Sequence, residues 1–502
     1  MNQRKAGVIL SYISMGLNAL IGFVYIPLLL AFLSKEQYGL YQLVGSMIAY
    51  LTIMDFGLAN TTVRYYSRLR AAKDKQGQEN LLATMLRLYG GISFFILIIG
   101  FLLLHILLPF YTKTLTPADI LTAKYIYWIM LFNLAIIIPG NIFSAVIQAH
   151  EKFIFLRCAN IANIVLQPCL VFAVLHFKAS VVALVIVQTL CNLSLFTANA
   201  YYCFAKLKIR FHLYHWDGKF VKEILYFSFF IFLNAIMDQI YWKTGQLILG
   251  AVVGTVSVAI YSVAIQLTMA YMGFSANISG VFLPHLSALA CKADSMPEIN
   301  QIFIKVGRLQ FYVVMLLFWG FCLFGKPFIL LWVGESFLPA YTYTLLFFAA
   351  LIIPLIQNTG ILILQAKNKH AFRAVIFVII ALLNVALSIP LAKHYGALAC
   401  ATVTAGCLLL GQGLILNIYY KYLGIAVGAF WKGIFSIFCP MLIPVVLFSA
   451  YLHYIKPPHT VLILGANIVG FSVLYIVILC FFAFNSYEKE LIKRPILKFI
   501  KK

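Results

Sequence analysis

The chain has 502 residues, of which 63% are hydrophobic and only 10% are charged. This composition excludes a soluble globular protein, because so few polar residues could not cover the surface of a chain of this length. The net charge of +23 would suit nucleic-acid binding. The basic residues are instead distributed as a membrane topology requires, so we expect no nucleic-acid partner.

Fourteen apolar segments are long enough to cross a bilayer, which takes about 20 helical residues. They lie at approximately 8–33, 38–59, 86–110, 120–147, 158–176, 180–204, 224–250, 254–286, 303–325, 338–365, 371–392, 396–420, 428–452 and 459–484. We therefore predict an all-α, polytopic membrane protein with about 14 transmembrane helices. The first segment is long and no small-residue cleavage site closes it, so we expect an uncleaved span rather than a signal peptide.

The basic residues alternate between the two sides of the predicted membrane. With the N-terminus in the cytoplasm, 29 of the 37 Lys and Arg residues fall at cytoplasmic ends and loops. Lys243 lies inside a segment, and the opposite side carries only Lys35, Lys113, Lys124, Lys178, Lys326, Lys393 and Lys456. This asymmetry is the positive-inside pattern, and it predicts an even number of spans with both termini in the cytoplasm.

A basic stretch at 205–222 separates the first six segments from the rest. We expect helices 1–6 (1–204) to form an N-lobe, 205–222 a cytoplasmic linker and helices 7–12 (223–422) a C-lobe. Residues 423–502 then hold helices 13 and 14 and a basic cytoplasmic tail. A weak internal repeat, in which 29–70 aligns without gaps on 249–290, supports two related lobes. Duplicated helical halves with a site at their interface are a common transporter plan.

The seventh segment contains Asp238 and Lys243. A lysine at the bilayer centre costs about 3 kcal/mol on insertion scales, so its presence needs a reason. Two helical stripes are predicted here, one of Asn234, Asp238, Tyr241 and Gly245, and a neighbouring one of Gln239, Lys243 and Gln246. We favour a cavity lining, because intramembrane ionisable residues mostly face pathways. A buried structural pair with a neighbouring helix stays open.

The first two segments carry further polar stripes. Ser11, Asn18, Gly22 and Tyr25 share a face of the first, where they can line a cavity or hold helices together. Tyr41, Gly45, Thr52 and Asp55 line up in the second. We expect Asp55 to make a local tie to the basic inner loop. Arg64, Arg68 and Arg70 are interpreted as topology markers that touch anionic headgroups, or as an inner-side patch where a diphosphate enters the protein.

No enzyme or metal-site motif is present. The chain has no P-loop, HExxH, GxSxG or Asp-x-Asp motif, and only Asp55 and Asp238 of its 14 acidic residues lie inside the predicted spans. His212 and His215 are spaced i, i+3 in a basic loop and are interpreted as surface histidines rather than metal ligands. The ten cysteines form no CxxC pair and fit small core positions. We expect no metal, no cofactor and no enzyme activity.

Several short stretches resemble a known family. They are Gly39-Leu40-Tyr41, Asp55-Phe56-Gly57-Leu58 and Val63-Arg64-Tyr65-Tyr66, followed by Gln246–Gly250 and Val258–Ala264. The chain resembles the bacterial polysaccharide-transport proteins, which are flippases of lipid-linked O-antigen and capsule repeat units. Their superfamily includes the multidrug and toxic-compound extrusion carriers. The family often has an acid a few residues before the Leu-Gly, where this chain has Gly245, and Asp238 is the nearest substitute.

The resemblance implies two six-helix bundles around a cavity that opens alternately to each side of the bacterial inner (plasma) membrane. The implied substrate is an undecaprenyl-diphosphate-linked oligosaccharide, moved from the inner to the outer leaflet for O-antigen, capsule or exopolysaccharide biosynthesis. Glycosyltransferases and a polysaccharide polymerase are the implied pathway partners. The candidate cavity or ion-coupling residues are Lys243, Asp238, Asn234, Gln239, Tyr241, Gln246, Asn18, Tyr25, Tyr41 and Asp55.

Two other functions stay open. A cation-coupled multidrug antiporter would have about twelve spans and an acidic cavity for cationic drugs, and Lys243 argues against it. A membrane-embedded polysaccharide polymerase or acyltransferase would need a large outer loop or a catalytic constellation of His or acidic residues, and the sequence contains neither.

Overall fold

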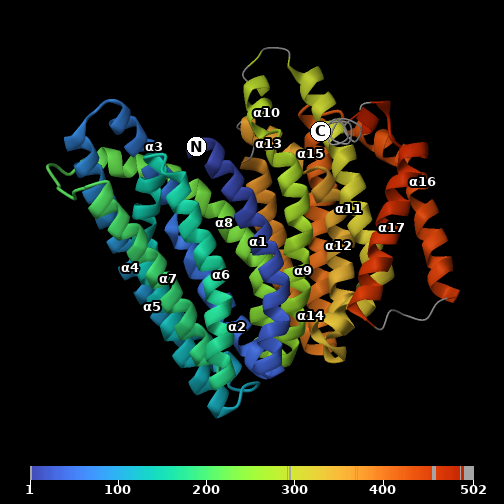
Figure 1. Cartoon of the computed structure of the whole chain (residues 1–502), viewed down its shortest axis with the longest axis horizontal. Coiled ribbons are helices and arrows are strands. Elements are labelled where there is room, and N and C mark those ends of the chain that lie inside the picture. Colours follow the sequence, from blue (N-terminus) through green and yellow to red (C-terminus); the bar gives the residue numbers. More distant parts are fainter. Residues whose placement is uncertain are drawn as a thin grey trace. The chain divides into compact units, whose positions relative to one another are not determined.

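The computed structural model describes the chain except for residues 1–2, 291, 293–294, 368, 370, 455–459, 487 and 491–502. The side chains of some further helical residues, most of them between 220 and 237, also lie outside the description. The described residues form helices and short connections and contain no strand (Figure 1).

The chain divides into two compact units, Met1–Ser262 with Ser388–Cys400, and Val263–Leu387 with Ala401–Lys502. The first unit holds α1 (Gln3–Phe32), α2 (Lys35–Thr52), α3 (Leu58–Ala71), α4 (Lys75–Tyr111), α5 (Pro117–Ala149), α6 (Phe153–Phe177), α7 (Val181–Tyr201) and α8 (Gly218–Val252). Helix α8 therefore packs with the first unit, where it contacts α2, α3 and α4. The predicted lobes divide at 205–222 instead. The compact units are defined by contacts between residues, whereas the predicted lobes rest on the basic linker and the internal repeat. Because these are different criteria, the two-lobe division stays a prediction.

Local sequence explains where the helices of the first unit begin and break. The Ser34 and Thr116 hydroxyls cap α2 and α5, each in a reciprocal capping box with the residue three positions later. Between α2 and α3 the chain makes a short 3-10 turn, Ile53–Asp55, followed by Phe56 and Gly57 in the left-handed region (φ 52° and 65°). This break holds Asp55 at the junction of two helices.

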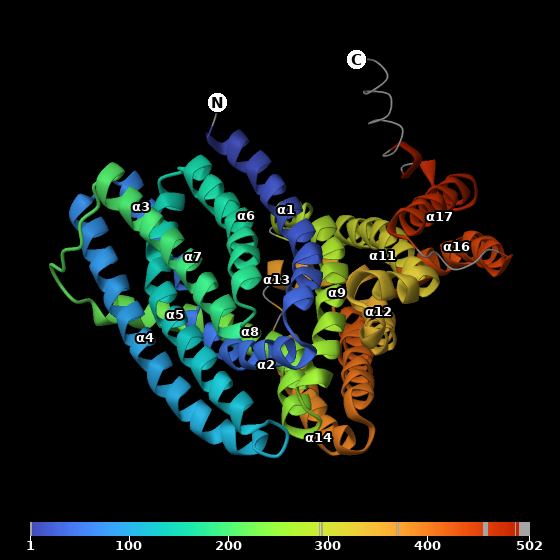
Figure 2. The ribbon, with the colours of Figure 1, turned by 60° about the horizontal axis from the view of Figure 1, so that its bottom comes forward.

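The first unit is a bundle of long neighbouring helices. Helix α1 lies along α6 in both views (Figures 1 and 2), and α5 packs against both α4 and α7. Gly39 of α2 faces the backbone carbonyl of Thr255 so closely that a Cβ atom would overlap it. The glycine of the Gly39-Leu40-Tyr41 motif is thus required by a close backbone approach.

The second unit contains most of α9 (Thr255–Gly280). Its other helices are α10 (Leu283–Ala290), α11 (Met296–Val333), α12 (Pro339–Ile356), α13 (Asn358–Ala366), parts of α14 (Ala371–Leu408), α15 (Leu416–Tyr422), α16 (Val427–Tyr454) and α17 (Val461–Phe482). Helix α14 bends at Gly396, whose φ of 61° is not helical. The bend lies at the first residue of the predicted segment 396–420, directly after the gap that follows the segment 371–392.

Twelve helical runs of the described residues are long and apolar enough to cross a membrane. One of them, Phe372–Tyr422, covers two predicted segments, and α8 covers the predicted segment 224–250. Large apolar side chains such as Leu462 and Phe481 are 86% and 76% exposed, which suits a lipid-facing surface. The predicted all-α, polytopic membrane fold is confirmed. The count of fourteen and the cytoplasmic placement of the termini stay predictions.

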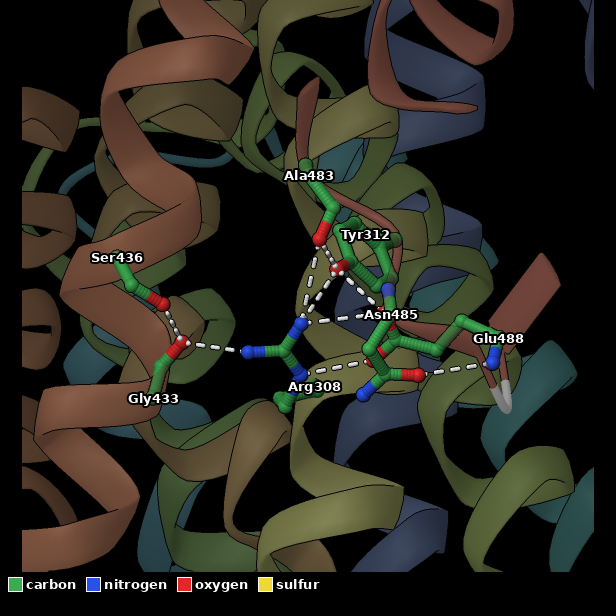
Figure 3. A network of polar contacts seen from close by, with 7 residues as sticks. All are labelled: Arg308, Tyr312, Gly433, Ser436, Ala483, Asn485 and Glu488. Atoms are coloured by element: carbon green, nitrogen blue, oxygen red, sulfur yellow. Dashed lines mark hydrogen bonds and ion pairs between the residues drawn. The ribbon is translucent and has the colours of Figure 1, made fainter. Parts of the chain in front are cut away.

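Arg308 joins three segments of the second unit (Figure 3). Its guanidinium makes a two-pronged ion pair with Glu488, at 2.7 and 3.1 Å, and donates to the carbonyl oxygens of Gly433 and Ala483 at 3.1 and 3.4 Å. The Tyr312 hydroxyl donates to the same carboxylate at 3.0 Å. The Arg308 and Glu488 side chains are only 13% and 3% exposed. A buried pair is tolerated when further hydrogen bonds satisfy it, as they do here.

Candidate functional site

Two predicted site residues, Tyr25 and Tyr41, meet at a glutamine. Gln188 of α7 donates from Nε2 to the Tyr25 hydroxyl of α1 at 3.1 Å and to the Tyr41 hydroxyl of α2 at 3.0 Å. All three side chains are half-buried. The bridge ties three helices of the first unit together, so it supports the helix-holding interpretation of the first stripe. Asn18, from the same stripe, is exposed.

Asp55 contacts an asparagine. Asn141 of α5 donates from Nδ2 to the Asp55 carboxylate at 3.2 Å, and Asp55 is half-buried. The contact that the structure describes thus runs from the α2–α3 break to the last third of α5. A tie from Asp55 to the basic inner loop stays a prediction.

The predicted residues of α8 lie in different environments. Lys243 and Gln239 are half-buried, whereas Asp238 is exposed. Tyr241 and Gln246 are 3% and 1% exposed, and the Gln246 amide donates to the Ser262 hydroxyl at 2.8 Å. The Asn234 side chain lies outside the described residues.

Helix α8 is fixed against α2 and α4. The hydroxyls of Tyr50 and Thr244 form a hydrogen bond, and Tyr50 also reaches the Gln239 carbonyl at 3.4 Å. Near the C-terminal end of α8, the hydroxyl of Thr114, in the turn after α4, donates to the Gly250 carbonyl at 2.7 Å. Lys243 therefore sits on a helix that is anchored on both sides of it.

Gly245 is the position at which the family resemblance described above leads us to expect an acid nearby. A Cβ atom at this position would lie 2.6 Å from the Tyr261 hydroxyl and 2.8 Å from the ring. In the observed packing of α8 against α9, a side chain at Gly245 would overlap the Tyr261 side chain, which would have to move.

The three arginines of α3 separate into two groups. Arg64 and Arg68 are exposed and line a cavity of about 600 Å³, together with Tyr65, Asp74, Asn80, His215 and Asp217. Arg70 points elsewhere and donates to the Ala149 carbonyl at 2.9 Å. A helix turns 100° per residue, so Arg64 and Arg68 share a face that Arg70 does not.

The segment after α7 closes one side of this cavity. The backbone amides of Tyr214 and His215 donate to the Asn80 side chain at 2.8 and 3.1 Å, and the Tyr214 hydroxyl donates to Glu79 at 2.9 Å. This hydrogen bond to a carboxylate raises the pKa of Tyr214. The carboxylates of Asp74 and Asp217 accept from the backbone amides of Gly77 and Lys219.

The turn between α5 and α6 holds a half-buried histidine. His150 Nε2 lies 3.2 Å from the Tyr66 hydroxyl. Burial, followed by the positive charges of Arg70 and Lys152, lowers the pKa of His150 to about 4. His150 is therefore neutral at physiological pH.

A second cavity, of about 290 Å³, lies between α5, α6 and α7. Its polar lining includes Asn141, Gln148, Arg157, Asn160, Asn192 and Asn199. None of these residues is among the site residues predicted from the sequence. A signal was present, because Asn141 and Gln148, like Asn192 and Asn199, are seven residues apart and so lie on one face of their helix.

The chain was compared with known proteins. The model of the family "Polysaccharide biosynthesis protein" matches residues 5–290, more than half of the chain. A search of curated proteins gave no significant match.

Solved structures share the fold at low sequence identity. The lipid II flippase MurJ, in an inward closed conformation, is 14% identical with a TM-score of 0.75, over 97% of this chain and 100% of that one. An inward-facing multidrug resistance transporter of the MATE family, in the MOP superfamily, is 14% identical with a TM-score of 0.64, over 85% and 99%. A MOP superfamily transporter from Pyrococcus furiosus is 15% identical with a TM-score of 0.56, over 86% and 97%.

These matches confirm the family resemblance predicted from the Gly39-Leu40-Tyr41 and Asp55-Phe56-Gly57-Leu58 stretches. The proteins of similar fold are a flippase and transporters. The protein belongs to the polysaccharide biosynthesis protein family and has a helical membrane fold similar to those of MurJ and of transporters in the MOP superfamily.

Proposed function

We propose that the protein is a flippase that moves an undecaprenyl-diphosphate-linked oligosaccharide from the inner to the outer leaflet of the bacterial inner membrane. Its product would feed O-antigen, capsule or exopolysaccharide synthesis, upstream of a polymerase and downstream of glycosyltransferases. The observation that carries the proposal is the family match over residues 5–290. The similarity of fold to a lipid II flippase agrees with it.

The arginine cavity supports an anionic headgroup as the substrate. Arg64 and Arg68 share one wall, and the Asp74 and Asp217 carboxylates there accept hydrogen bonds from backbone amides. Guanidinium groups match phosphate oxygens in geometry and charge. In the proposed cycle this inner-side patch receives the diphosphate before it enters the protein.

Lys243 is the proposed contact for the diphosphate inside the membrane. It is half-buried on α8, and an ammonium at that depth is retained most readily where it meets an anion or water. Gln239, on the same helix, and Tyr25 and Tyr41 would contact sugar hydroxyls. Asp238 is the proposed proton or cation site. No nucleotide-binding motif occurs in the sequence, so we propose that an ion gradient or the membrane potential supplies the energy.

Replacement of Lys243 tests this role in a cell that needs the exported glycan. We expect Lys243→Ala to abolish most surface polysaccharide at unchanged protein level, and Lys243→Arg to retain part of it. Lys124→Ala removes an exposed lysine of α5 and should have no effect. Undiminished surface polysaccharide in Lys243→Ala would exclude a central role for Lys243.

A multidrug antiporter is the second candidate, because the fold also resembles MATE transporters and twelve described helical runs could span a membrane. Drug susceptibility of a deletion strain separates the two functions. A flippase predicts altered surface glycan with unchanged resistance to cationic drugs. Hypersensitivity with intact glycan would favour the antiporter, and a covalently changed glycan made by the purified protein would favour an enzyme.

A further inference from the structure

The cavity between α5, α6 and α7 has a mixed lining, in which polar side chains come from all three helices. On α5, its lining runs from Gln148 in the last turn to Asn141, a rise of about 10 Å along the helix axis. Asn192 and Asn199 line it from α7, and Arg157 from α6. All three helices are apolar enough to span a membrane. Polar groups at such positions need hydrogen-bond partners, because burying them without one is costly.

Two of these groups have buried atoms without a partner among the described residues. Asn199 is only 6% exposed, and its side-chain oxygen accepts no hydrogen bond. The Nε atom of Arg157 is buried and donates to nothing. The structure describes no ion pair for Arg157, whereas Asp55, the acidic residue tied to Asn141, belongs to the α2–α3 break. The cavity therefore presents a guanidinium Nε and an amide oxygen that the described protein groups leave without a hydrogen-bond partner.

The chemistry of this lining selects a particular kind of ligand. A guanidinium offers a planar fork of donors that fits phosphate or carboxylate oxygens. Asparagine side chains both donate and accept, as sugar hydroxyls require. At about 290 Å³ the cavity is near the lower end of small-molecule sites, which begin at about 300 Å³. A single sugar ring with its anionic group is a ligand of suitable size.

We propose that this cavity binds the anionic, hydroxyl-bearing headgroup of a sugar phosphate. Arg157 contacts the anion, and Asn160, Asn192 and Asn199 contact the hydroxyls. The inference deepens the proposed flippase function and rests on it for the identity of the sugar phosphate. It adds a site inside the first unit, distinct from the arginine cavity of α3 and from Lys243.

Ligand-induced thermal stabilisation of the purified full-length protein in nanodiscs tests the proposal. The probes are N-acetylglucosamine 1-phosphate, neutral N-acetylglucosamine and undecaprenyl-diphosphate-linked N-acetylglucosamine. We expect a phosphorylated probe to raise the Tm of the wild type and the neutral sugar to raise it much less. A response to the soluble phosphate alone assigns the site to a free sugar phosphate, and a response to the lipid-linked probe alone assigns it to the lipid-linked form.

The variants locate the binding. Arg157→Gln should weaken binding of the phosphorylated probe about tenfold or more, because hydrogen bonds to charged groups are the stronger ones. Arg157→Lys should retain part of it. Asn192→Ala removes a hydroxyl contact without touching the charge and should weaken binding less. Arg210→Gln removes an exposed arginine outside this cavity and should bind as the wild type does.

Equal stabilisation of the wild type and Arg157→Gln by every probe would overturn the proposal, and so would a wild type that no probe stabilises. Failure of the flippase function gives a different result. Intact surface glycan in a deletion strain, with binding that still depends on Arg157, would refute the flippase and leave the sugar phosphate site standing. Loss of surface glycan in the deletion strain, with binding that does not depend on Arg157, would support the flippase and refute the sugar phosphate site.

Discussion

Arg308 and Arg157 are both arginines of long apolar helices, but their surroundings differ. Arg308, in the second unit, has a carboxylate, a phenol and two carbonyls within hydrogen-bond distance. Arg157, in the first unit, lines a cavity with a buried Nε that has no described partner. A satisfied polar group inside a membrane protein holds the fold together, whereas an unsatisfied one that faces a cavity is available to a ligand.

The same contrast extends to uncharged groups. Gln357 and Asn417 of the second unit exchange two hydrogen bonds of 2.9 Å, and Trp431 donates to Asn417 at 3.0 Å. The Asn199 oxygen of the first unit accepts none. Residue type alone therefore does not distinguish a structural polar residue from a ligand-binding one. The hydrogen-bond partners of the residue make this distinction.

The largest expected effect on stability comes from breaking the ion pair between Arg308 and Glu488. Glu488→Gln leaves the buried Arg308 charge without its counter-ion and should lower the free energy of unfolding by about 3–5 kcal/mol. Arg308→Gln should cost about as much, and the double variant less than the sum, because the two residues share one interaction. Thermal unfolding of the purified protein measures this, with the exposed Lys432→Gln as a control. An unchanged Tm in Glu488→Gln would contradict the claim that Arg308 stabilises the fold through its ion pair.

Gln188 tests whether a polar side chain with hydrogen-bond partners also stabilises the first unit. Gln188→Leu removes the donor that Tyr25 and Tyr41 share, and we expect a loss of about 1–2 kcal/mol. Gln76→Leu, at an exposed position of α4, should have no measurable effect on the Tm. If Gln188→Leu is as stable as the wild type, the bridge is not a structural tie, and a substrate role for the two tyrosines gains support.

Protonation of His150 places a third positive charge beside those of Arg70 and Lys152. Its pKa is about 4 when folded, against 6.5 for the free side chain. The unfolded chain therefore takes up a proton first, so stability is complete above about pH 6.5 and falls as the pH drops toward 4. Between pH 7.5 and 5.5 we expect a loss of about 1 kcal/mol or less, because solvent screens a half-exposed group. His150→Gln should lose less Tm over this range, and an equal loss would contradict the assignment.

The smallest expected change in stability is at Arg157. Arg157→Met removes a charge that has no described counter-ion, so the Tm without ligand should fall by little or should rise. The informative comparison is between the Tm change of Arg157→Met and that of Arg308→Gln. A loss at Arg157→Met as large as that at Arg308→Gln would show that Arg157 is a structural residue.

Much of the fold could be predicted from the sequence, because long apolar runs in a membrane protein must be helices. Positions within a single helix were also predictable. The spacing of Arg64, Arg68 and Arg70 already separates Arg70 from the other two, although the prediction grouped all three. The bend at Gly396 falls where the second of two neighbouring predicted segments, 396–420, begins.

Contacts between helices were not predictable from periodicity. A stripe on α1 or α2 shows that Tyr25 and Tyr41 each face inward, but not that Gln188 of α7 lies between them. The cavity at Arg157 was missed for a related reason, since its asparagines come from three helices and carry no charge. The overlap that a side chain at Gly245 would make depends on Tyr261, which is on the next helix.

Translocation in reconstituted vesicles tests the central claim most directly. Undecaprenyl-diphosphate-linked N-acetylglucosamine starts in the inner leaflet, and an external galactosyltransferase reports how fast the sugar becomes accessible. The flippase account predicts that the wild type accelerates exposure of the chemically unchanged lipid under an imposed ion gradient or membrane potential, and that Lys243→Ala does so far more slowly. Exposure under both driving forces no faster than in protein-free vesicles would contradict it.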